Sequence, residues 1–201
     1  MPSKLYQIYN NLYKFFEYRD IIPEDQQKDE YTFNNDILDS LYIKLLGKNN
    51  RTNNDIIIYF FTISDKNLFQ STEFNKFFNN NIKVSKHSEI IIIIDSAIMT
   101  SSRHKKINKL KNKKDRLELY DYDIFSTVKP EHILAPKHEI LPKDEEELLI
   151  NHCKLNGKHE LPFININDPQ IIWIGANIGD VVKITGRDEI AGEYMEYRLV
   201  I

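Results

Sequence analysis

The stretch from Thr100 to Arg116 contains the residue types that most directly suggest chemistry. It holds one acidic residue, Asp115, against eight basic ones: Arg103, Lys105, Lys106, Lys109, Lys111, Lys113, Lys114 and Arg116. Thr100, Ser101 and Ser102 would place hydroxyls and free backbone amides at the start of a helix, which suits an anion. The pattern predicts salt-sensitive contacts with nucleic-acid phosphates, without base readout. A solvated helix face is the alternative.

Histidines and the single cysteine are the natural candidates for a metal site. In the second half of the chain they are His132, His138, His152, Cys153 and His159. No pair among them has the C-x-x-C or H-x-x-x-H spacing that brings two ligands to one metal, and adjacent side chains on a helix diverge. The sequence therefore predicts no metal site and no cofactor.

Acidic residues beside a buried strand would suit metal-dependent hydrolysis. Glu89 precedes the apolar run 90–94 and Asp95 follows it, but no Glu/Asp-x-Lys triplet follows either residue at a strand. The chain also lacks a G-x-S-x-G motif and a glycine-rich phosphate loop. Asp95 is therefore predicted to cap a turn or helix, and the chain is predicted not to be an enzyme by itself. A nuclease-like protein that uses Asp95 remains the alternative.

Two helices are predicted at the start of the chain. Ser3 can cap the first, whose apolar residues recur at three- and four-residue spacing: Leu5, Ile8, Tyr9, Leu12, Phe15 and Phe16. Thr32 is the predicted cap of the second helix, and Gly47 is its predicted stop. The apolar face of this second helix would consist of Phe33, Ile37, Leu41 and Leu45.

A small sheet is predicted next. Residues 56–61 and 90–94 are apolar and β-branched without polar alternation, which is typical of strands buried on both faces. Residues 72–79 predict a short helix between them, so the two strands would pair in parallel. A third β-like stretch covers residues 117–125. Residues 1–128 are therefore predicted to form a three-layer α/β domain with a small mixed sheet.

The charge balance changes sign near Pro130. Residues 131–201 carry 13 acidic and 7 basic residues, a net charge of -6, whereas residues 1–130 carry 17 and 20, a net charge of +3. This asymmetry predicts two domains with different partners, at residues 1–128 and 129–201. The second is predicted to be a small α/β module. Its elements would be a helix after Pro142, a short helix from Asp168-Pro169 to Gly175, and two final antiparallel strands.

The cellular compartment can also be predicted. The single cysteine, Cys153, excludes an intramolecular disulfide and fits a reducing environment. The N-terminus lacks the pattern of a secretory signal, and the apolar run 90–94 is too short to span a membrane. A soluble, intracellular protein without a membrane partner is therefore expected.

The segment His132-Ile133-Leu134-Ala135-Pro136-Lys137-His138 resembles the His-x-Leu-Val-Pro-x-His segment of the RNA polymerase subunit 5 family, which has eukaryotic and archaeal members. The family's order continues through Leu161-Pro162 and Asp168-Pro169. It then extends over Gly175, Gly179, Val181-Val182-Lys183-Ile184, Arg187, Glu189, Ala191-Gly192, Tyr194 and Tyr197-Arg198-Leu199-Val200. The resemblance covers about 70 residues densely. Before residue 130 it is limited to layout and to Met99-Thr100-Ser101-Ser102, similar to a Met-Thr-Pro-Ser turn of the family.

The resemblance implies a non-catalytic subunit of a multisubunit DNA-directed RNA polymerase. Residues 129–201 would assemble on the largest subunit, and the expected contacts are His138, Trp173, Arg187, Tyr194, Tyr197 and Arg198. For the three aromatic residues among them, the alternative is that they fill the core. Residues 1–128 would form a jaw over downstream double-stranded DNA and contact its backbone without sequence specificity. The expected DNA contacts are Thr100, Ser101, Arg103, Lys105, Lys106 and Lys109.

Some residues depart from the family pattern. Phe163 and Glu193 stand where arginine is common, and Ala176-Asn177-Ile178 replaces a more basic stretch. Together with the bias toward Ile, Asn and Lys, these departures suggest a version from a large DNA virus. The expected location is the nucleus, or a cytoplasmic viral factory or virion for a viral protein. A free-standing DNA-binding transcription adaptor is the other alternative to a polymerase subunit.

Overall fold

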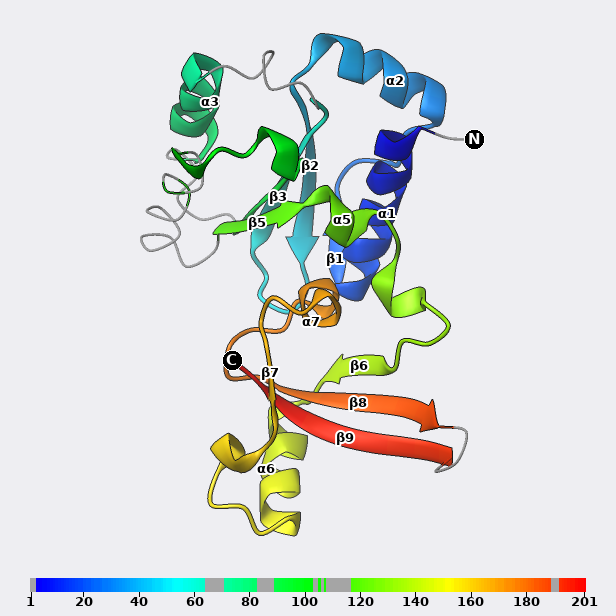
Figure 1. Ribbon diagram of the computed structural model, residues 1–201, viewed down its shortest axis with the longest axis vertical. Coiled ribbons are helices and arrows are strands. Elements are labelled where there is room, and N and C mark those ends of the chain that lie inside the picture. Colours follow the sequence, from blue (N-terminus) through cyan, green and yellow to red (C-terminus); the bar gives the residue numbers. More distant parts are fainter. Residues whose placement is uncertain are drawn as a thin grey trace. The chain divides into compact units, whose positions relative to one another are not determined.

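The computed structural model describes residues 3–63, 71–82, 89–102, 105, 107, 117–188 and 192–201. The chain divides into two compact units, Met1–Thr127 (unit 1) and Val128–Ile201 (unit 2), each with its own sheet. Figure 1 shows the helices and strands of both units. Each unit is described by itself below.

Unit 1 is built on a five-stranded mixed sheet of order β1-β2-β3-β4-β5. Its strands are β1 (Ile21–Pro23), β2 (Tyr42–Asn49), β3 (Asp55–Phe61), β4 (Glu89–Ile94) and β5 (Leu117–Asp121). The pairs β1–β2 and β2–β3 are antiparallel, whereas β3–β4 and β4–β5 are parallel. The predicted parallel pairing of the runs 56–61 and 90–94 is therefore confirmed.

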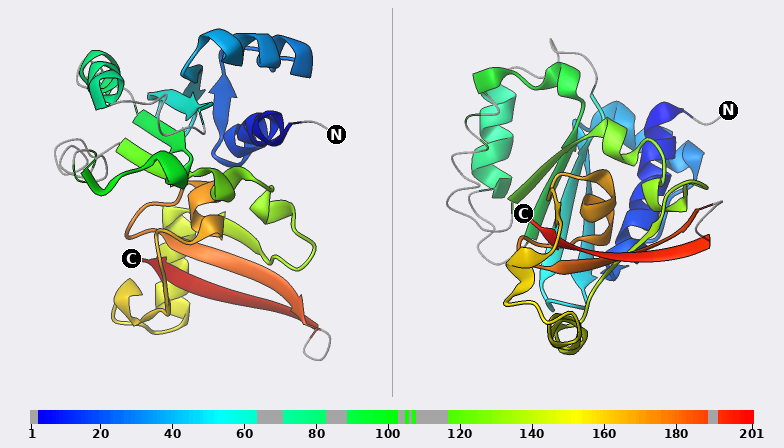
Figure 2. Two further views of the ribbon diagram at one scale, coloured as in Figure 1. Left: turned by 45° about the horizontal axis from the view of Figure 1, so that its top comes forward. Right: turned by 60° about the horizontal axis from the view of Figure 1, so that its bottom comes forward.

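Both faces of this sheet are buried, which explains the unbroken apolar runs. In β3, Ile57, Tyr59 and Phe61 alternate with Ile56, Ile58 and Phe60, so the two sets lie on opposite faces. The first set joins Ile90, Ile92 and Ile94 of β4, with Phe77 and Phe78, in one apolar cluster. Helices α3 (Ser71–Phe77) and α1 (Lys4–Tyr18) cover opposite faces of the sheet (Figure 2). Unit 1 thus has three layers.

The first helix begins as predicted, and the second differs. Ser3 caps α1, because its hydroxyl accepts a hydrogen bond from the Tyr6 amide. Helix α2 (Glu30–Asp39) is capped by Asp29 and not by Thr32, whose amide donates to the Asp29 carboxylate at 2.8 Å. It also ends at Asp39, so the prediction of one helix as far as Gly47 is wrong.

Strand β2 takes the place of the second half of that helix. Burial alternates along it, with Ile43, Leu45 and Gly47 buried between exposed or half-buried neighbours. This two-residue period fits a strand that pairs with β3 better than it fits a helix face. The third predicted β stretch is also shorter than expected, because Asp121 caps the one-turn helix α5 (Tyr122–Phe125) immediately after β5.

Short helical segments complete unit 1. The predicted helix 72–79 is α3, which continues as the π-helix η1 (Phe78–Ile82). Asp95 caps the 3-10 helix η2 (Ser96–Ile98), where its carboxylate accepts a hydrogen bond from the Ala97 amide at 2.8 Å. The predicted capping role of Asp95 is therefore confirmed.

Unit 2 contains a four-stranded sheet of order β6-β8-β9-β7. The strands are β6 (Lys137–Ile140), β7 (Phe163–Ile164), β8 (Val181–Asp188) and β9 (Gly192–Val200). Strands β8 and β9 form the predicted antiparallel pair at the end of the chain, and β7 runs parallel to β9. Two 3-10 turns, η3 (Lys129–Glu131) and η4 (Lys158–Glu160), join the other elements.

Two helices lie on opposite faces of this sheet (Figure 1). Helix α7 (Pro169–Ile174) begins at the cap Asp168 and ends at Gly175, whose left-handed backbone (φ 67°) closes the helix. Val182, Ile184 and Val200 pack with α7, whereas Val181 and Leu199 pack on the face of α6 (Lys143–His152). The predicted fold class, α/β units with mixed sheets, is confirmed.

Candidate functional site

A hollow in the surface of unit 2 lies between the segment 133–137 and the far end of the β8–β9 hairpin. Its volume is about 450 Å³, and the hairpin contributes residues 185–187 and 193–194. The segment 133–137 belongs to the His-to-His stretch that carries the family resemblance. The hollow is therefore the place where that stretch meets the final hairpin.

Two aliphatic side chains stand beside the hollow in full contact with solvent. Ile133 and Leu134 are 93% and 83% exposed, which is unusual for neighbouring large apolar residues. The backbone that presents them is held in a turn, because the Leu134 amide donates to His132 Nδ1 at 3.2 Å and the Ala135 amide donates to the His132 carbonyl at 2.8 Å. His132 thus shapes the backbone and leaves both aliphatic side chains available to a partner.

The hairpin supplies the opposite wall. Gly186 faces Tyr194 in the β8–β9 register, and the Tyr194 ring occupies the space over this glycine. Met195, 54% exposed, follows on the other face of β9, where its sulfur accepts a hydrogen bond from the Tyr197 hydroxyl at 3.1 Å. The hairpin therefore presents aromatic and thioether surface.

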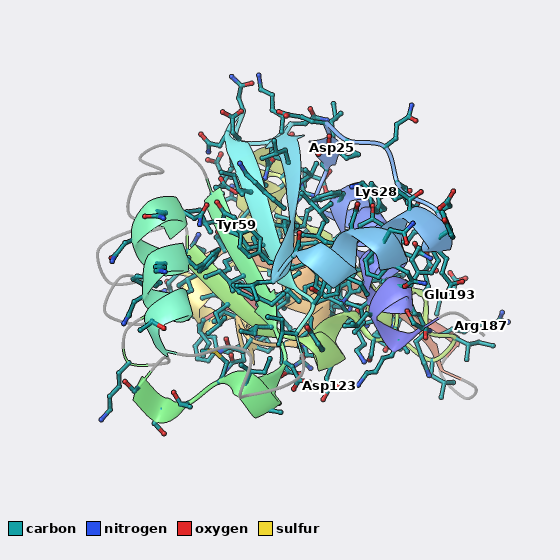
Figure 3. The ribbon with its side chains drawn as sticks, turned by 90° about the horizontal axis from the view of Figure 1, so that it is seen from above. Asp25, Lys28, Tyr59, Asp123, Arg187 and Glu193 are labelled. Carbon is teal, nitrogen blue, oxygen red and sulfur yellow. The ribbon has the colours of Figure 1, made fainter. Side chains whose placement is uncertain are left out.

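The hairpin also carries charged side chains. Arg187 and Glu193 are directly opposite in the register, and both are exposed (Figure 3). Arg198 donates to both carboxylate oxygens of Glu196, at 3.1 and 3.2 Å. The site thus combines apolar groups with ionic ones, as protein interfaces do.

The predicted partner contacts have different outcomes in the structure. Arg187 and Tyr194 line the hollow, and His138 is half-buried beside it, where its Nδ1–H donates to the Pro136 carbonyl at 2.8 Å. Trp173 has no exposed surface, because all the apolar side chains of α7 are buried. Trp173 therefore fills the core of unit 2, which was the alternative to a partner contact.

Several residues of this surface were not predicted from the sequence. Ile133, Leu134, Gly186, Glu193 and Met195 were not among the expected contacts, although the first four line the hollow and Met195 is exposed on the other face of β9. Two features of the sequence could have pointed to this surface. One is a pair of large aliphatic residues in a short proline-containing segment between two histidines. The other is a single glycine opposite a tyrosine in the last hairpin.

An ionic network supports unit 2 on the face of α6. The Glu146 carboxylate, with 10% of its side chain exposed, lies 3.1 Å from Lys158 Nζ and 3.4 Å from Lys143 Nζ. Lys158 also donates to the Gly179 carbonyl at 2.6 Å, so its ammonium joins α6 to the loop that leads into β8. The Glu146 charge is therefore neutralised within the fold.

The basic segment of unit 1 is described only in part. Ser101, Ser102, Lys105 and Ile107 are helical, so the predicted helix begins after Thr100. Ser101 and Lys105 are exposed, while Ile107 is buried in the apolar cluster beside α3. Of the predicted DNA contacts, Arg103, Lys106 and Lys109 lie outside the described residues.

The acidic residues near β4 have structural partners. Glu89 accepts hydrogen bonds from Thr52 Oγ1 at 3.2 Å and Asn54 Nδ2 at 3.0 Å, and Asp95 is a helix cap. Within the described ranges, no group of three His, Cys, Asp or Glu side chains is placed to hold a metal ion. No described helix has the length and apolar character needed to cross a membrane.

A buried charge in unit 1 also has its partners. The Arg19 side chain donates to Glu118 at 2.8 Å and to the Tyr120 hydroxyl at 3.2 Å, and its guanidinium lies 4.5 Å from the centre of the Phe15 ring. Burial raises the pKa of Tyr120. This arrangement joins the end of α1 to β5, and it accounts for the arginine as part of the fold.

The sequence of unit 2 identifies the family. The family model for the C-terminal domain of RNA polymerase Rpb5 matches residues 128–200. A DNA-directed RNA polymerase subunit Rpo5 from Nitrosopumilus maritimus is 45% identical over 74 residues, which are 36% of this chain and 86% of the relative. The chain belongs to the Rpb5/Rpo5 family. This Rpb5/Rpo5 match lies in unit 2.

Other members of the Rpb5/Rpo5 family give the same result. The Rpo5 subunit from Archaeoglobus fulgidus is 48% identical over 71 residues, or 35% of this chain and 92% of the relative. That from Methanococcus vannielii is 40% identical over 70 residues, or 35% and 88%. Since the match covers most of each relative, these Rpo5 chains consist of little besides the counterpart of unit 2.

Proposed function

We propose that this chain is a non-catalytic subunit of a multisubunit DNA-directed RNA polymerase. The observation that carries the proposal is the match of residues 128–200 to the Rpb5 family. Unit 1 lies outside this family match, and its described residues include no group of side chains placed to hold a metal ion. Its acidic residues beside β4 make hydrogen bonds within the fold. The chain therefore acts through binding.

Unit 2 is the assembly domain, and its partner is the largest polymerase subunit. The exposed Ile133 and Leu134 beside the hollow support this role, because neighbouring exposed aliphatic residues mark protein contacts. Relatives composed mainly of this unit also support it, since they retain the polymerase subunit name without a counterpart of most of unit 1.

Unit 1 is the jaw that positions downstream double-stranded DNA. Ser101 and Ser102, at the start of a helix, and Lys105 are exposed, so hydroxyl groups and positive charge are accessible to a phosphate there. Arg103, Lys106 and Lys109 belong to the same run in the sequence. Contacts of this kind bind phosphates regardless of base sequence.

The experiment that tests this function is affinity purification of the full tagged chain from its native source. We expect the two largest polymerase subunits to be recovered in equal amounts with the chain, as quantified by mass spectrometry. Recovery of the chain alone, in extracts where the polymerase itself is intact, would contradict the proposal. The expected location of this chain is the nucleus, or a cytoplasmic viral factory or virion if the chain comes from a large DNA virus.

The assembly role of the hollow has its own test. Replacing Ile133 and Leu134 with Asp should reduce recovery of the large subunits at least about tenfold, since each buried aliphatic contact contributes roughly 1–2 kcal/mol. Leu148→Asp is the matched control, because Leu148 is also an exposed leucine (67%) but lies on α6. Equal losses from both variants would remove the argument for this surface.

A further inference from the structure

One edge of the unit 2 sheet is covered over only part of its length. Strand β7 pairs with β9 at Phe163–Leu199 and Ile164–Val200, whereas β9 already begins at Gly192. The part of β9 from Glu193 to Tyr197 pairs with β8 on one side only, among the described residues. This open edge spans about 17 Å at about 3.4 Å per residue.

The direction of the backbone groups along β9 follows from the hydrogen bonds at its end. The amides of Leu199 and Ile201 donate toward β7, to Pro162 at 2.8 Å and Ile164 at 2.9 Å. The amide of Val200 points the other way. Because backbone groups alternate along a strand, those of Glu193, Met195 and Tyr197 face the open edge. They have no hydrogen-bond partner among the described residues.

Pro162 explains why β7 does not extend further along β9. In the parallel register of β7 and β9, the next donor along β7 would be the backbone nitrogen of residue 162, opposite the Tyr197 carbonyl. Pro162 has no N–H and cannot make this bond. The polypeptide then turns away into η4, so the sequence itself leaves the position beside Tyr197 vacant.

The side chains along the open edge favour an added strand. Natural edge strands are commonly protected by lysine or proline, and neither occurs from Gly192 to Tyr197. Met195 and Tyr194 are 54% and 39% exposed, so they offer apolar surface to an incoming strand. Glu193 is exposed, and although Arg187 faces it across the β8–β9 ladder, no ion pair joins these two described side chains.

We propose that this edge receives an extended segment of the largest polymerase subunit, which adds a strand to the sheet beside β9. The inference rests on the proposed function and specifies how unit 2 binds its partner. Backbone hydrogen bonds at Glu193, Met195 and Tyr197 hold the added strand. Its side chains on the Met195 face alternate in register, with a basic residue beside Glu193 and an apolar residue beside Met195.

The negative charge of Glu193 favours a partner segment with a positively charged side chain. Opposite charges at directly facing positions stabilise a strand pair, whereas like charges destabilise it. Unit 2 is acidic as a whole, with 13 acidic and 7 basic residues from 131 to 201, which also favours a basic segment. A second copy of this chain offers no basic residue between Gly192 and Tyr197 to face Glu193, so self-pairing lacks this complementarity.

Hydrogen exchange tests whether the outward backbone groups of β9 become hydrogen-bonded in the complex. In the free chain, the amides of Tyr194, Glu196 and Arg198 pair with β8 and should be protected, whereas those of Glu193, Met195 and Tyr197 should exchange at least about tenfold faster. In purified polymerase all six amides should be protected. Fast exchange at Glu193, Met195 and Tyr197 in an intact complex would overturn the inference while leaving the proposed function standing.

Variants at Met195 provide the second readout. Met195→Pro removes an outward N–H without touching the β8 ladder, and Met195→Lys keeps the backbone but opposes a basic segment. Each should lower recovery of the large subunits about tenfold or more. Ile178→Lys, at a position 72% exposed in the loop before β8, is the matched control and should retain recovery. Circular dichroism establishes that each variant is folded.

Three further outcomes would each contradict a different part of the proposal. Normal recovery of polymerase with a folded Met195→Lys variant would overturn the edge assignment. If the wild-type chain recovers no polymerase, the proposed function fails and the partner named here fails with it. A concentration-dependent dimer of the free chain that Met195→Pro abolishes would assign the edge to a second copy and overturn the polymerase segment as its occupant.

Discussion

The Tyr194 ring lies directly over the backbone of Gly186. A Cβ atom built on Gly186 would stand 2.4 Å from both Cζ and Oη of Tyr194, far inside van der Waals contact. The two residues are cross-strand partners in the β8–β9 hairpin, and both line the hollow of unit 2. The absence of a side chain at residue 186 thus determines where the tyrosine ring sits at the candidate interface.

Replacing Gly186 with Ala should displace the Tyr194 ring and destabilise the chain. The expected cost is about 1 kcal/mol, because the obstructing atoms are the far end of a partly exposed side chain that can move aside. Urea unfolding, followed by circular dichroism, measures this change in the free energy of unfolding. In the Tyr194→Ala background the same Gly186→Ala change should cost markedly less, because the obstructing ring is gone. Equal costs in the two backgrounds would show that the ring is not the obstacle.

The two lysines at Glu146 should differ in their contribution to stability. Lys158→Met leaves the mostly buried Glu146 carboxylate and the Gly179 carbonyl without their shared donor, and should cost about 2 kcal/mol. Lys143→Met is the matched control, since the Lys143 side chain is 73% exposed, and should change stability by about 0.5 kcal/mol or less. Thermal unfolding of both variants measures the difference. An equal effect would mean that the Gly179 contact contributes nothing.

Stability should decrease at alkaline pH. Burial raises the pKa of Tyr59 to about 12, while an unfolded tyrosine titrates near 10. The neutral phenol is therefore favoured by folding, and its contribution is fully present below about pH 10 and is lost as the pH rises through about 12. Burial also raises the pKa of Tyr13 and Tyr122. Urea midpoints measured from pH 8 to 12 should fall, and Tyr59→Phe should make that fall shallower. An unchanged slope in this variant would rule out Tyr59 as a contributor.

Reversing charge in the basic segment should weaken DNA binding without affecting assembly. The triple change Lys105→Glu, Lys106→Glu and Lys109→Glu removes predicted phosphate contacts, so affinity for downstream duplex should fall at least about tenfold at low salt. The slope of log affinity against log salt should also become shallower, by about one for each phosphate that the chain no longer binds. Fluorescence anisotropy with purified polymerase measures both quantities.

The control for this prediction is a charge reversal elsewhere on unit 1. Lys44 and Lys48 are exposed lysines of β2, and changing both to Glu should leave DNA affinity within about twofold. If the basic-segment variant instead separates from the large subunits, the division of roles between the units is wrong. If both sets of charge reversals lower the DNA affinity equally, the effect comes from the overall charge of the chain and not from contacts made by the basic segment.

Unit 2 should fold without unit 1. A fragment of residues 128–201 contains the complete β6-β8-β9-β7 sheet with α6 and α7, and it corresponds to most of the length of the archaeal relatives. We expect a cooperative thermal transition by circular dichroism. A fragment without cooperative unfolding would show that unit 2 depends on the rest of the chain.

The sequence predicted much of the fold where local rules operate. Ser3 caps α1, Asp168-Pro169 begins α7 and Gly175 ends it, because these residues have strong intrinsic preferences at helix ends. The apolar runs in β3 and β4 identified strands buried on both faces. The error at residues 41–47 arose because Leu41 and Leu45 also fit a helical period, and only pairing with β3 selects the strand.

The family of unit 2, the start and end of α7 and the break in β7 all follow from the amino-acid sequence, whereas α6 ends at His152, before the glycine expected to stop it. The break in β7 follows from Pro162, since a residue without an N–H cannot extend a ladder in any surroundings. Which apolar residues are exposed could be known only from the packed fold, because burial depends on the elements that lie against each side chain. The fold placed Trp173 inside and Ile133 and Leu134 outside, and it brought Gly186 beneath Tyr194 through the register of a hairpin. The open edge of β9 also depends on the tertiary structure, because an edge is unpaired only in relation to the strands that pair elsewhere in the sheet.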